Sequence, residues 1–288
     1  MAGIRINQMT NPKPTDTRPI TTRFITCGQS KGSLGNSTVA DTFLGWLQFA
    51  GIPFAAIDAD LQHKTLSRRY PSKDVKSAGV TESQDTFGVM LSNLPSKPVL
   101  LMDRPAQSTD KLLAYAEHYQ MVAAFEHTGI RLTLLVFCSD NVDALDSAVA
   151  TVEYFGDRAD YVMIENSACF RSDEFKKTGL YDWLVQRSAP TIVVPHISKV
   201  SLNAWEVAEQ KADRCLALAD VIEFADLPFI AKLELSGVRN RMLVQFEDCA
   251  PVLLPDPSLI KNKVSRVDAK VSQQQPTSRF KNPLIMKK

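Results

Sequence analysis

The chain has 288 residues, of which 44% are hydrophobic and 23% are charged, and its formal net charge is +1. This length is enough for one α/β domain with a large core, and the composition is typical of a soluble protein. No apolar run approaches the roughly 18 to 20 residues that span a bilayer, and residues 1–22 lack the apolar centre of a signal peptide. We therefore expect a cytoplasmic protein without an integral membrane segment.

The first predicted elements are a strand, a glycine-rich turn and a helix. Residues 24–27 are a short β-prone run, and residues 39–50 carry apolar side chains at helical spacing before Gly51. The turn between them, residues 28–38, reads GQSKGSLGNST. A turn of this kind aims backbone N–H groups and the positive end of the helix dipole at one point, where an anion binds. The segment predicts a phosphate-binding loop; the alternative is an ordinary turn in which Ser37 caps the helix.

The loop departs from the standard G-x-x-x-x-G-K-[ST] pattern at two of its anchor positions. Ser30 replaces the first glycine and Asn36 replaces the lysine, whereas Gly35 and Ser37 match. Asparagine donates hydrogen bonds but supplies no positive charge to the phosphates, so we expect hydrolysis to be impaired. A charge-assisted hydrogen bond contributes roughly 1.5 to 3 kcal/mol, so its loss weakens binding about 10- to 150-fold.

Two later apolar runs end in carboxylates. Residues 54–57 are followed by Asp58 and Asp60, and residues 99–102 are followed by Asp103. Buried parallel strands deliver such groups to the carboxyl edge of a sheet, where ligands bind in open α/β folds. Each acid alone is more typical of a helix cap or a turn. The ordered set behind a glycine-rich loop favours a metal or water site.

In the rest of the chain, predicted strands continue to alternate with predicted helices. We expect strands over residues 132–137, 161–165 and 191–194, helices over 112–123, 142–155, 202–218 and 228–246, and a loop followed by a helix over 173–186. The alternation predicts an α/β fold, with a doubly wound, mostly parallel sheet and helices on both faces. We expect three parts: a disordered segment over residues 1–22, the domain over 23–250, and a flexible basic tail over 251–288.

Three segments in this order resemble the deviant Walker A P-loop ATPases of the ParA/MinD superfamily. They read KGSLGNST at residues 31–38, IDADLQ at 57–62 and LMDRPAQ at 101–107. The family pattern is K-G-G-x-G-K-[ST]-[ST], a D-x-D-x-Q segment and a hydrophobic strand ending in D-x-P. The D-x-P-A-Q sequence looks most similar to plasmid stabilisation and conjugal-transfer proteins of the StbB/TraL type. The resemblance extends over residues 24–195 and implies ATP and Mg²⁺ as cofactors.

The resemblance also implies site roles by position. The nucleotide-binding residues would be Gly32, Ser33, Leu34, Gly35, Asn36, Ser37, Thr38, Asn166 and Pro195. The last two fall where relatives read the adenine edge and line the base pocket, although both residue types are common at strand ends. Ser37, Asp58 and Asp103 would serve the metal. Lys31, Asp60 and Asp103 would serve catalysis, with Lys31 reaching the partner's phosphates in a nucleotide-sandwich homodimer and Asp60 orienting the attacking water.

Two main functions remain open from the sequence. The first is a nucleotide-binding switch or weak ATPase that dimerises on ATP and acts in plasmid stability, DNA positioning or conjugal transfer, with a partner protein of such a complex. The alternative is a non-catalytic pseudo-ATPase of the same fold that acts as a scaffold or adaptor. A metabolic P-loop synthetase is a third reading, for which the sequence offers no substrate-pocket signature.

The cysteines, the histidines and the chain end add smaller predictions. Five scattered cysteines without a C-x-x-C pair are expected to be reduced core residues, and four histidines without ligand spacing argue against a structural metal. Residues 261–288 hold eight Lys and Arg against one acid, a net +7. Such a tail can contact DNA through its phosphates without sequence preference, or an acidic partner. The alternative is a solvated terminus without a function.

Overall fold

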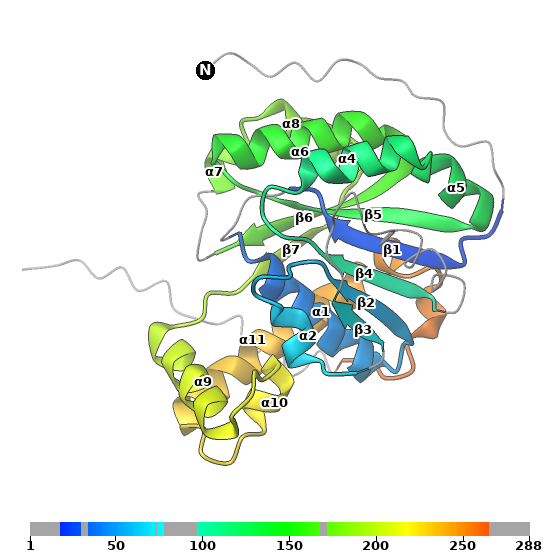
Figure 1. Cartoon of the computed structure of the whole chain (residues 1–288). Coiled ribbons are helices and arrows are strands. Elements are labelled where there is room, and N and C mark those ends of the chain that lie inside the picture. Colours follow the sequence, from blue (N-terminus) through cyan, green and yellow to red (C-terminus); the bar gives the residue numbers. More distant parts are fainter. Residues whose placement is uncertain (1–17, 30–33, 73, 78–96, 168–171, 265–288) are drawn as a thin grey trace, which may run out of the picture.

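The computed structural model describes residues 18–29, 34–72, 74–77, 97–167 and 172–264. In these ranges a seven-stranded sheet has the order β3-β2-β4-β1-β5-β6-β7, and every strand pair is parallel. The strands are β1 (Thr22–Cys27), β2 (Phe54–Asp58), β3 (Val75–Ser77), β4 (Val99–Asp103), β5 (Ile130–Phe137), β6 (Ala159–Asn166) and β7 (Thr191–Val194). The predicted doubly wound α/β fold is confirmed (Figure 1).

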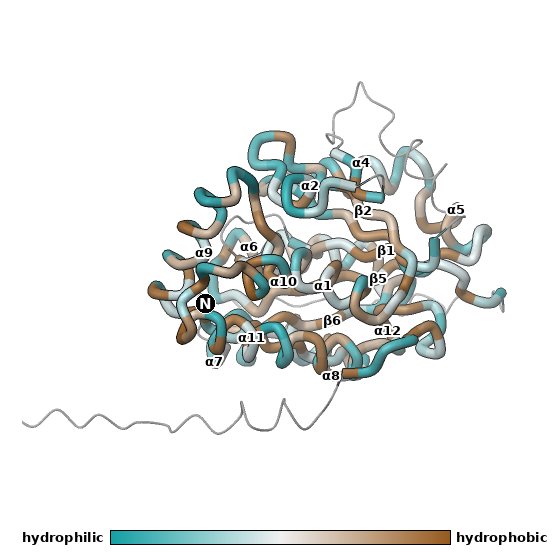
Figure 2. Tube along the Cα trace, turned by 90° about the horizontal axis from the view of Figure 1, so that it is seen from below, coloured by the Kyte–Doolittle hydropathy of each residue, from teal (hydrophilic) through white to brown (hydrophobic). Residues whose placement is uncertain are grey.

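Helices cover both faces of the sheet (Figure 1). One face carries α1 (Asn36–Ala50), α11 (Phe229–Asp248) and α12 (Ala250–Leu253), and α2 (Thr65–Arg69) follows β2. The other face carries α4 (Thr109–His118), α5 (Met121–Thr128), α6 (Val142–Phe155) and α8 (Gly179–Gln186), with the short α7 (Ser172–Phe175) nearby. The central strands are buried on both sides, and hydrophobic stretches run along them (Figure 2).

The glycine-rich turn joins β1, at the centre of the sheet, to α1. The apolar residues at helical spacing (Val39, Phe43, Trp46, Leu47 and Ala50) are buried, and Trp46 and Phe43 pack with Phe246 of α11. Gly51 ends the helix in the left-handed conformation, as a glycine C-cap does. Because α1 is held along its whole length, its N-terminus is fixed relative to the strand ends.

A helical lobe stands beside the sheet domain (Figure 1). It consists of α9 (Lys199–Ala212), α10 (Leu218–Ile222) and the first half of α11, and it has its own core around Trp205 and Leu235. The single helix predicted over residues 202–218 is therefore wrong. Asp213 takes a left-handed φ of 50°, and the Glu209 carboxylate accepts the Leu216 N–H at 2.9 Å, so the chain turns between α9 and α10.

The first part of the predicted basic tail packs against the domain. Leu253 and Leu254 are buried, the Lys261 N–H donates to the Ala50 carbonyl at 2.9 Å, and the Asn262 side chain donates to the Phe49 carbonyl at 2.8 Å. Residues 251–264 thus close over the end of α1 instead of leaving the domain. Residues 265–288 and 1–17 lie outside the described residues.

Candidate functional site

The start of the glycine-rich loop is fastened to β5. The Gly28 N–H donates to the Leu135 carbonyl at 2.8 Å. The buried side chain of Gln29 donates to the Phe137 carbonyl at 2.5 Å and accepts the Phe137 N–H at 2.6 Å. Through these two hydrogen bonds the Gln29 side chain pairs with the backbone of Phe137 in β5. The sequence did not predict this role of Gln29. Lys31, Gly32 and Ser33 follow and lie outside the described residues.

The end of the loop requires a glycine. Gly35 has φ of 97° and precedes the first residue of α1, and a Cβ at this position would lie 2.5 Å from the Asn166 side-chain nitrogen. That nitrogen donates to the carbonyl of the buried Leu34 at 2.9 Å. Asn166 therefore fastens the loop to the tip of β6. A larger residue at position 35 would be strained and would displace this contact.

Asn36, at the position of the expected lysine, points to the base of the loop. Its Oδ1 accepts a hydrogen bond from the Cys27 thiol at 3.5 Å. Burial raises the pKa of Cys27 to about 11, so the thiol is neutral and can donate. The Asn36 side chain, which stands in place of the lysine, therefore makes a hydrogen bond within the protein.

Ser37 and Asp103 meet where α1 begins and β4 ends. Their side chains are hydrogen-bonded, and Asp103 pairs directly with Asp58 in the register of β4 with β2. Burial raises the pKa of Asp103 to about 7, with further increases from the charges of Asp58 and Asp60. The Ser37 hydrogen bond and the Arg104 charge act in the opposite direction. The sequence prediction that these acids gather beside the loop agrees with this geometry.

Asp58 and Asp60 also hold the turn that follows β2. Asp58 is fully buried, and its carboxylate accepts the N–H groups of Ser67 at 2.8 Å and of Asp60 at 3.3 Å. The Asp60 Oδ1 accepts the N–H groups of Gln62 at 3.0 Å and His63 at 3.1 Å. Asp58 and Asp60 therefore form the turn, as the alternative interpretation of the sequence predicted. Both carboxylates nevertheless also lie near Asp103.

The other expected nucleotide contacts lie at the same sheet edge. Asn166 and Val194 are paired in register at the ends of β6 and β7, and half-buried Pro195 follows Val194 directly. Thr38 lies in the first turn of α1, and its carbonyl accepts the Thr42 hydroxyl at 2.9 Å. The edge therefore gathers every predicted site residue that the structure describes.

Arg104 is a structural member of the site that the sequence left without a role. The residue is buried, its guanidinium donates to the Cys27 carbonyl, and it also contacts the Ser108 carbonyl at 3.2 Å. It ties the tip of β4 to the tip of β1, from which the loop starts. An arginine directly after a strand-ending acid is the only sequence signal for this contact.

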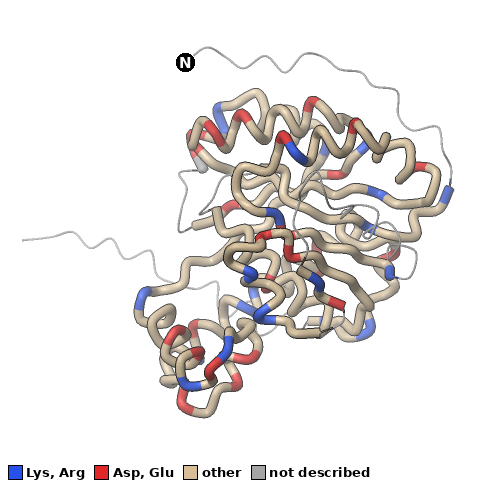
Figure 3. The backbone as a smooth tube through the Cα atoms, viewed as in Figure 1, with Lys and Arg blue, Asp and Glu red and all other residues tan. Residues whose placement is uncertain are grey.

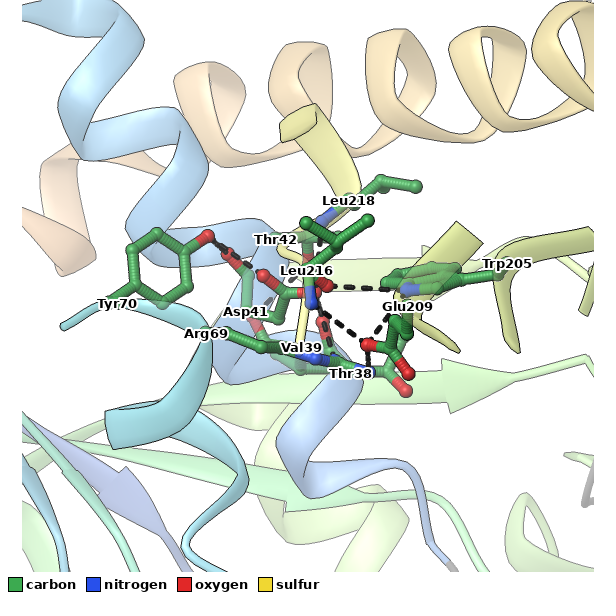
Figure 4. Close-up of polar contacts among 10 residues, drawn as sticks. All are labelled: Thr38, Val39, Asp41, Thr42, Arg69, Tyr70, Trp205, Glu209, Leu216 and Leu218. Atoms are coloured by element: carbon green, nitrogen blue, oxygen red, sulfur yellow. Dashed lines mark hydrogen bonds and ion pairs between the residues drawn. The ribbon is translucent and has the colours of Figure 1, made fainter. Parts of the chain in front are cut away.

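A second polar cluster joins α1 to the helical lobe (Figure 4). The buried Asp41 carboxylate accepts hydrogen bonds from Arg69 at 3.0 Å, from the Tyr70 hydroxyl at 2.8 Å and from the Leu218 N–H at 3.3 Å. Arg69 lies over the Trp205 ring, 4.8 Å from its centroid, and within 4.0 Å of Glu209. We call these residues the Asp41 cluster; its partners are far apart in the sequence, and the sequence did not predict it.

The site is rich in acids and needs oxygen ligands from elsewhere to hold a cation. Among the described residues, no three His, Cys, Asp or Glu side chains form a group that could hold a metal ion alone. A serine hydroxyl and carboxylates are nevertheless the hard oxygen donors that suit Mg²⁺, which keeps waters and takes phosphate oxygens as further ligands. The residues present therefore fit a magnesium ion that arrives with a phosphate. In the described ranges every helix is too short or too polar to span a bilayer.

Comparisons with known proteins give structural likeness only. No protein-family model matches the chain, and no curated protein matches it. Among solved structures, the MinC:MinD cell division protein complex of Aquifex aeolicus matches with a TM-score of 0.43 and 14% identity, covering 77% of this chain and 96% of that chain. MinD cell division protein of Aquifex aeolicus matches with a TM-score of 0.39 and 16% identity, covering 77% and 97%.

FlhF complexed with GMPPNP and Mg²⁺ also matches, with a TM-score of 0.35 and 12% identity over 62% of this chain and 68% of that chain. These identities and TM-scores are too low to carry function from these proteins to this chain. The functional reading therefore depends on the arrangement of the residues themselves.

Proposed function

We propose that the protein is a ParA/MinD-like nucleotide-binding switch or weak ATPase that binds Mg²⁺ and ATP at the carboxyl edge of the sheet. The observation that carries this proposal is the pairing of Asp58 with Asp103 at the strand ends beside Ser37, where α1 begins directly after left-handed Gly35. A hydroxyl at a helix N-terminus, a water-holding carboxylate behind it and a glycine-rich loop are the parts that a P-loop uses.

The described residues support a division of roles. Backbone N–H groups from Leu34 to Thr38, with the dipole of the 15-residue α1, favour phosphate oxygens. Ser37 would ligate Mg²⁺ directly, and Asp103 and Asp58 would hold its waters. Bound Mg²⁺ would neutralise charge on the transferred phosphoryl group. Asp60 would orient the attacking water, while Asn166 and Pro195 would border the base.

The loop residues that lie outside the described ranges complete the proposal. Gly32 and Ser33 would supply further backbone N–H groups, and Lys31 would reach the phosphates of a second subunit in an ATP-dependent homodimer. The basic tail would contact DNA through phosphates, in a partition or transfer complex with a partner protein. These finer roles follow from the motif resemblance and are part of the same proposal.

One observation favours a non-catalytic variant of this function. Asn36 supplies no positive charge, and its hydrogen bond to Cys27 turns it to the base of the loop. Phosphoryl transfer depends on charge stabilisation around the transferred group, so we expect slow turnover and a long-lived bound state. A scaffold that retains the fold without binding nucleotide is the second candidate.

Isothermal titration of the full chain with ATP, with and without Mg²⁺, tests the proposal. We expect Mg²⁺-dependent ATP binding with slow release of phosphate. Ser37→Ala should weaken the Mg²⁺-dependent part of the affinity about tenfold or more, because it removes one ligand and one hydrogen bond. Ser147→Ala, in α6 on the other face of the sheet, is the matched control. Absence of ATP binding by the wild-type chain would contradict the proposal and support the scaffold.

A further inference from the structure

The helical lobe carries an apolar face that no described residue covers. We call it the lobe face and define it by Val200, Val207, Phe229, Ile230 and Leu233. These side chains are 68%, 49%, 76%, 65% and 62% exposed, respectively. The first two belong to α9 and the other three to the start of α11. Soluble monomers rarely expose so many large apolar side chains together, and such patches mark interaction sites.

The two helices lie side by side and run in opposite directions. At one end Ser198 and Ser201 of α9 donate hydroxyl hydrogen bonds to Glu234 of α11. At the other end Lys211 pairs with Asp226, just before α11, at 2.8 Å. Between these ends Val207 lines the same groove as Pro228. Because Phe229 follows Pro228 directly, the exposed apolar residues at the start of α11 begin beside the groove that Val207 lines.

The first half of α11 is apolar on two opposite sides. Ala231, Leu235 and Val238 are buried in the core of the lobe, whereas Phe229, Ile230 and Leu233 face outward. The outward apolar side of this half of α11 therefore has no covering partner among the described residues. The largest apolar patch on a monomer covers roughly 300 to 600 Å² and is often functional, and five large exposed side chains make a patch of that kind.

Charges beside the lobe face favour a second copy of the chain as the occupant. Positions of both signs surround the lobe (Figure 3). Lys199 and Glu206 are exposed, lie seven residues apart on the outer border of α9, and have no ion pair within the described part of the chain. Seven residues are two helical turns. In an antiparallel pair of α9 helices related by a two-fold axis, Lys199 of each copy faces Glu206 of the other.

We propose that two copies of the chain associate through the lobe face, with their α9 helices antiparallel and without any nucleotide. A two-fold interface needs a self-complementary surface, which the apolar stripe and the Lys199 and Glu206 pair provide. A standard interface buries roughly 800 Å² per partner, so polar residues around the lobe face would supply the rest of the contact. This interface is separate from the nucleotide edge, so its test does not depend on the proposed ATP site.

Sedimentation velocity of the full chain without nucleotide, over a wide range of concentrations, tests this proposal. We expect a concentration-dependent dimer. Ile230→Glu should raise the dimer dissociation constant about 30-fold or more, because it places a charge in a desolvated interface in both copies. The matched control is Val142→Glu, at a valine of α6 that is 67% exposed, which should leave the dissociation constant unchanged. Circular dichroism confirms that both variants are folded.

Exchange of the charges at positions 199 and 206 distinguishes the antiparallel pairing of α9 helices from other ways of forming a dimer. Lys199→Glu and Glu206→Lys should each weaken the dimer, and the double variant should restore the wild-type dissociation constant. A chain that stays monomeric at every concentration would overturn the proposal. A dimer that Ile230→Glu leaves intact would also overturn it, and a double variant no stronger than the single ones would overturn the antiparallel arrangement.

Discussion

Helix α1 connects two buried carboxylate clusters that are built in opposite ways. Ser37 in its first turn is bonded to Asp103, and Asp41 one turn later is bonded to Arg69, Tyr70 and the Leu218 N–H. Asp41 is thus surrounded by donors and a cation. Asp103 has two further carboxylates beside it, and its neighbour Arg104 donates instead to backbone carbonyl groups.

The difference separates a structural cluster from the proposed binding site. Burial raises the pKa of both carboxyl groups, but Asp41 has a direct ion pair with Arg69 and hydrogen bonds from Tyr70 and Leu218, whereas the Ser37 hydrogen bond and the Arg104 charge at Asp103 are opposed by two further acids. The acids around Asp103 repel one another within the protein alone. We infer that a cation brought by the ligand completes the Asp103 cluster, whereas the Asp41 cluster is complete and holds the lobe to α1.

Removal of the counter-ion from the Asp41 cluster should have the largest effect on stability. Arg69→Ala leaves the buried Asp41 carboxylate without its cation and should lower the free energy of unfolding by about 3 to 5 kcal/mol. Chemical denaturation measures this loss. Arg68→Ala, which removes the exposed neighbouring arginine, is the control and should change stability by less than about 0.5 kcal/mol. Equal effects of the two variants would show that the Asp41 cluster is not held by its ion pair.

Neutralisation of Asp103 should stabilise the protein in the absence of ligands. Its folded-state pKa of about 7 lies above the ordinary value of 3.8, so the unfolded chain ionises first as pH rises. The wild-type protein should therefore lose up to about 4 kcal/mol of stability from this group between pH 4 and pH 7. Asp103→Asn should remove that loss and be the more stable protein at pH 8.

Denaturation curves of wild type and Asp103→Asn across this pH range give the comparison. Asp213→Asn, at an exposed left-handed position that asparagine also tolerates, should follow the wild-type pH dependence. Parallel curves for wild type and Asp103→Asn would mean that burial and the neighbouring acids do not raise the pKa of Asp103, and the contrast between the two clusters would fail.

Gly35→Ala should disturb the loop while Gly45→Ala does not. At position 35 the φ of 97° and the 2.5 Å approach of Asn166 should cost about 1 to 3 kcal/mol of stability and most of the ATP affinity. At position 45, inside α1, a Cβ meets only the Tyr70 hydroxyl at 3.6 Å, so alanine should stabilise by about 0.4 to 1 kcal/mol. Thermal unfolding distinguishes the two signs, and a stabilising Gly35→Ala would contradict the described loop geometry.

Asn36→Lys should produce a modest gain in the free energy of ATP binding. A lysine restores a charge-assisted contact to phosphate of about 1.5 kcal/mol, which corresponds to roughly tenfold tighter ATP binding. Faster phosphate release is expected as well, because the added charge stabilises the transition state more than the ground state. Titration calorimetry and a phosphate assay measure both. Asn36→Ala is the control: it loses the Cys27 contact without adding charge, and an equal gain in that variant would contradict the explanation.

Local patterns predicted the parts of the site that lie at strand ends. The acids follow directly after β2 and β4, and parallel strands necessarily bring their carboxyl ends to one edge, so the meeting of Asp58 with Asp103 was predictable. The placement of Ser37 followed from the strand, turn and helix order. The hydrogen bonds of Asp58 and Asp60 to the turn after β2 correspond to the alternative interpretation of the sequence, in which each acid forms a cap or a turn.

Contacts between distant segments could not be predicted in this way. Asp41 binds Arg69, 28 residues away, and the Leu218 N–H, 177 residues away, and no periodicity links these positions. The break between α9 and α10 depends on the Glu209 side chain, which accepts the Leu216 N–H and so competes with the helix. The first half of α11 contains apolar residues on both its buried and its exposed side. The sequence alone does not distinguish the exposed Phe229, Ile230 and Leu233 from core residues.

Proton release on binding of Mg²⁺ and ATP tests the central claim most directly. At pH 7 the Asp103 carboxyl, with its pKa of about 7, is about half protonated, and a cation in the cluster should ionise it. Calorimetric titrations in buffers of different ionisation enthalpy should therefore show release of about half a proton at pH 7 and almost none at pH 9. Absence of binding at both pH values, or equal release at both, would contradict the assignment of the Asp103 cluster as the nucleotide and magnesium site.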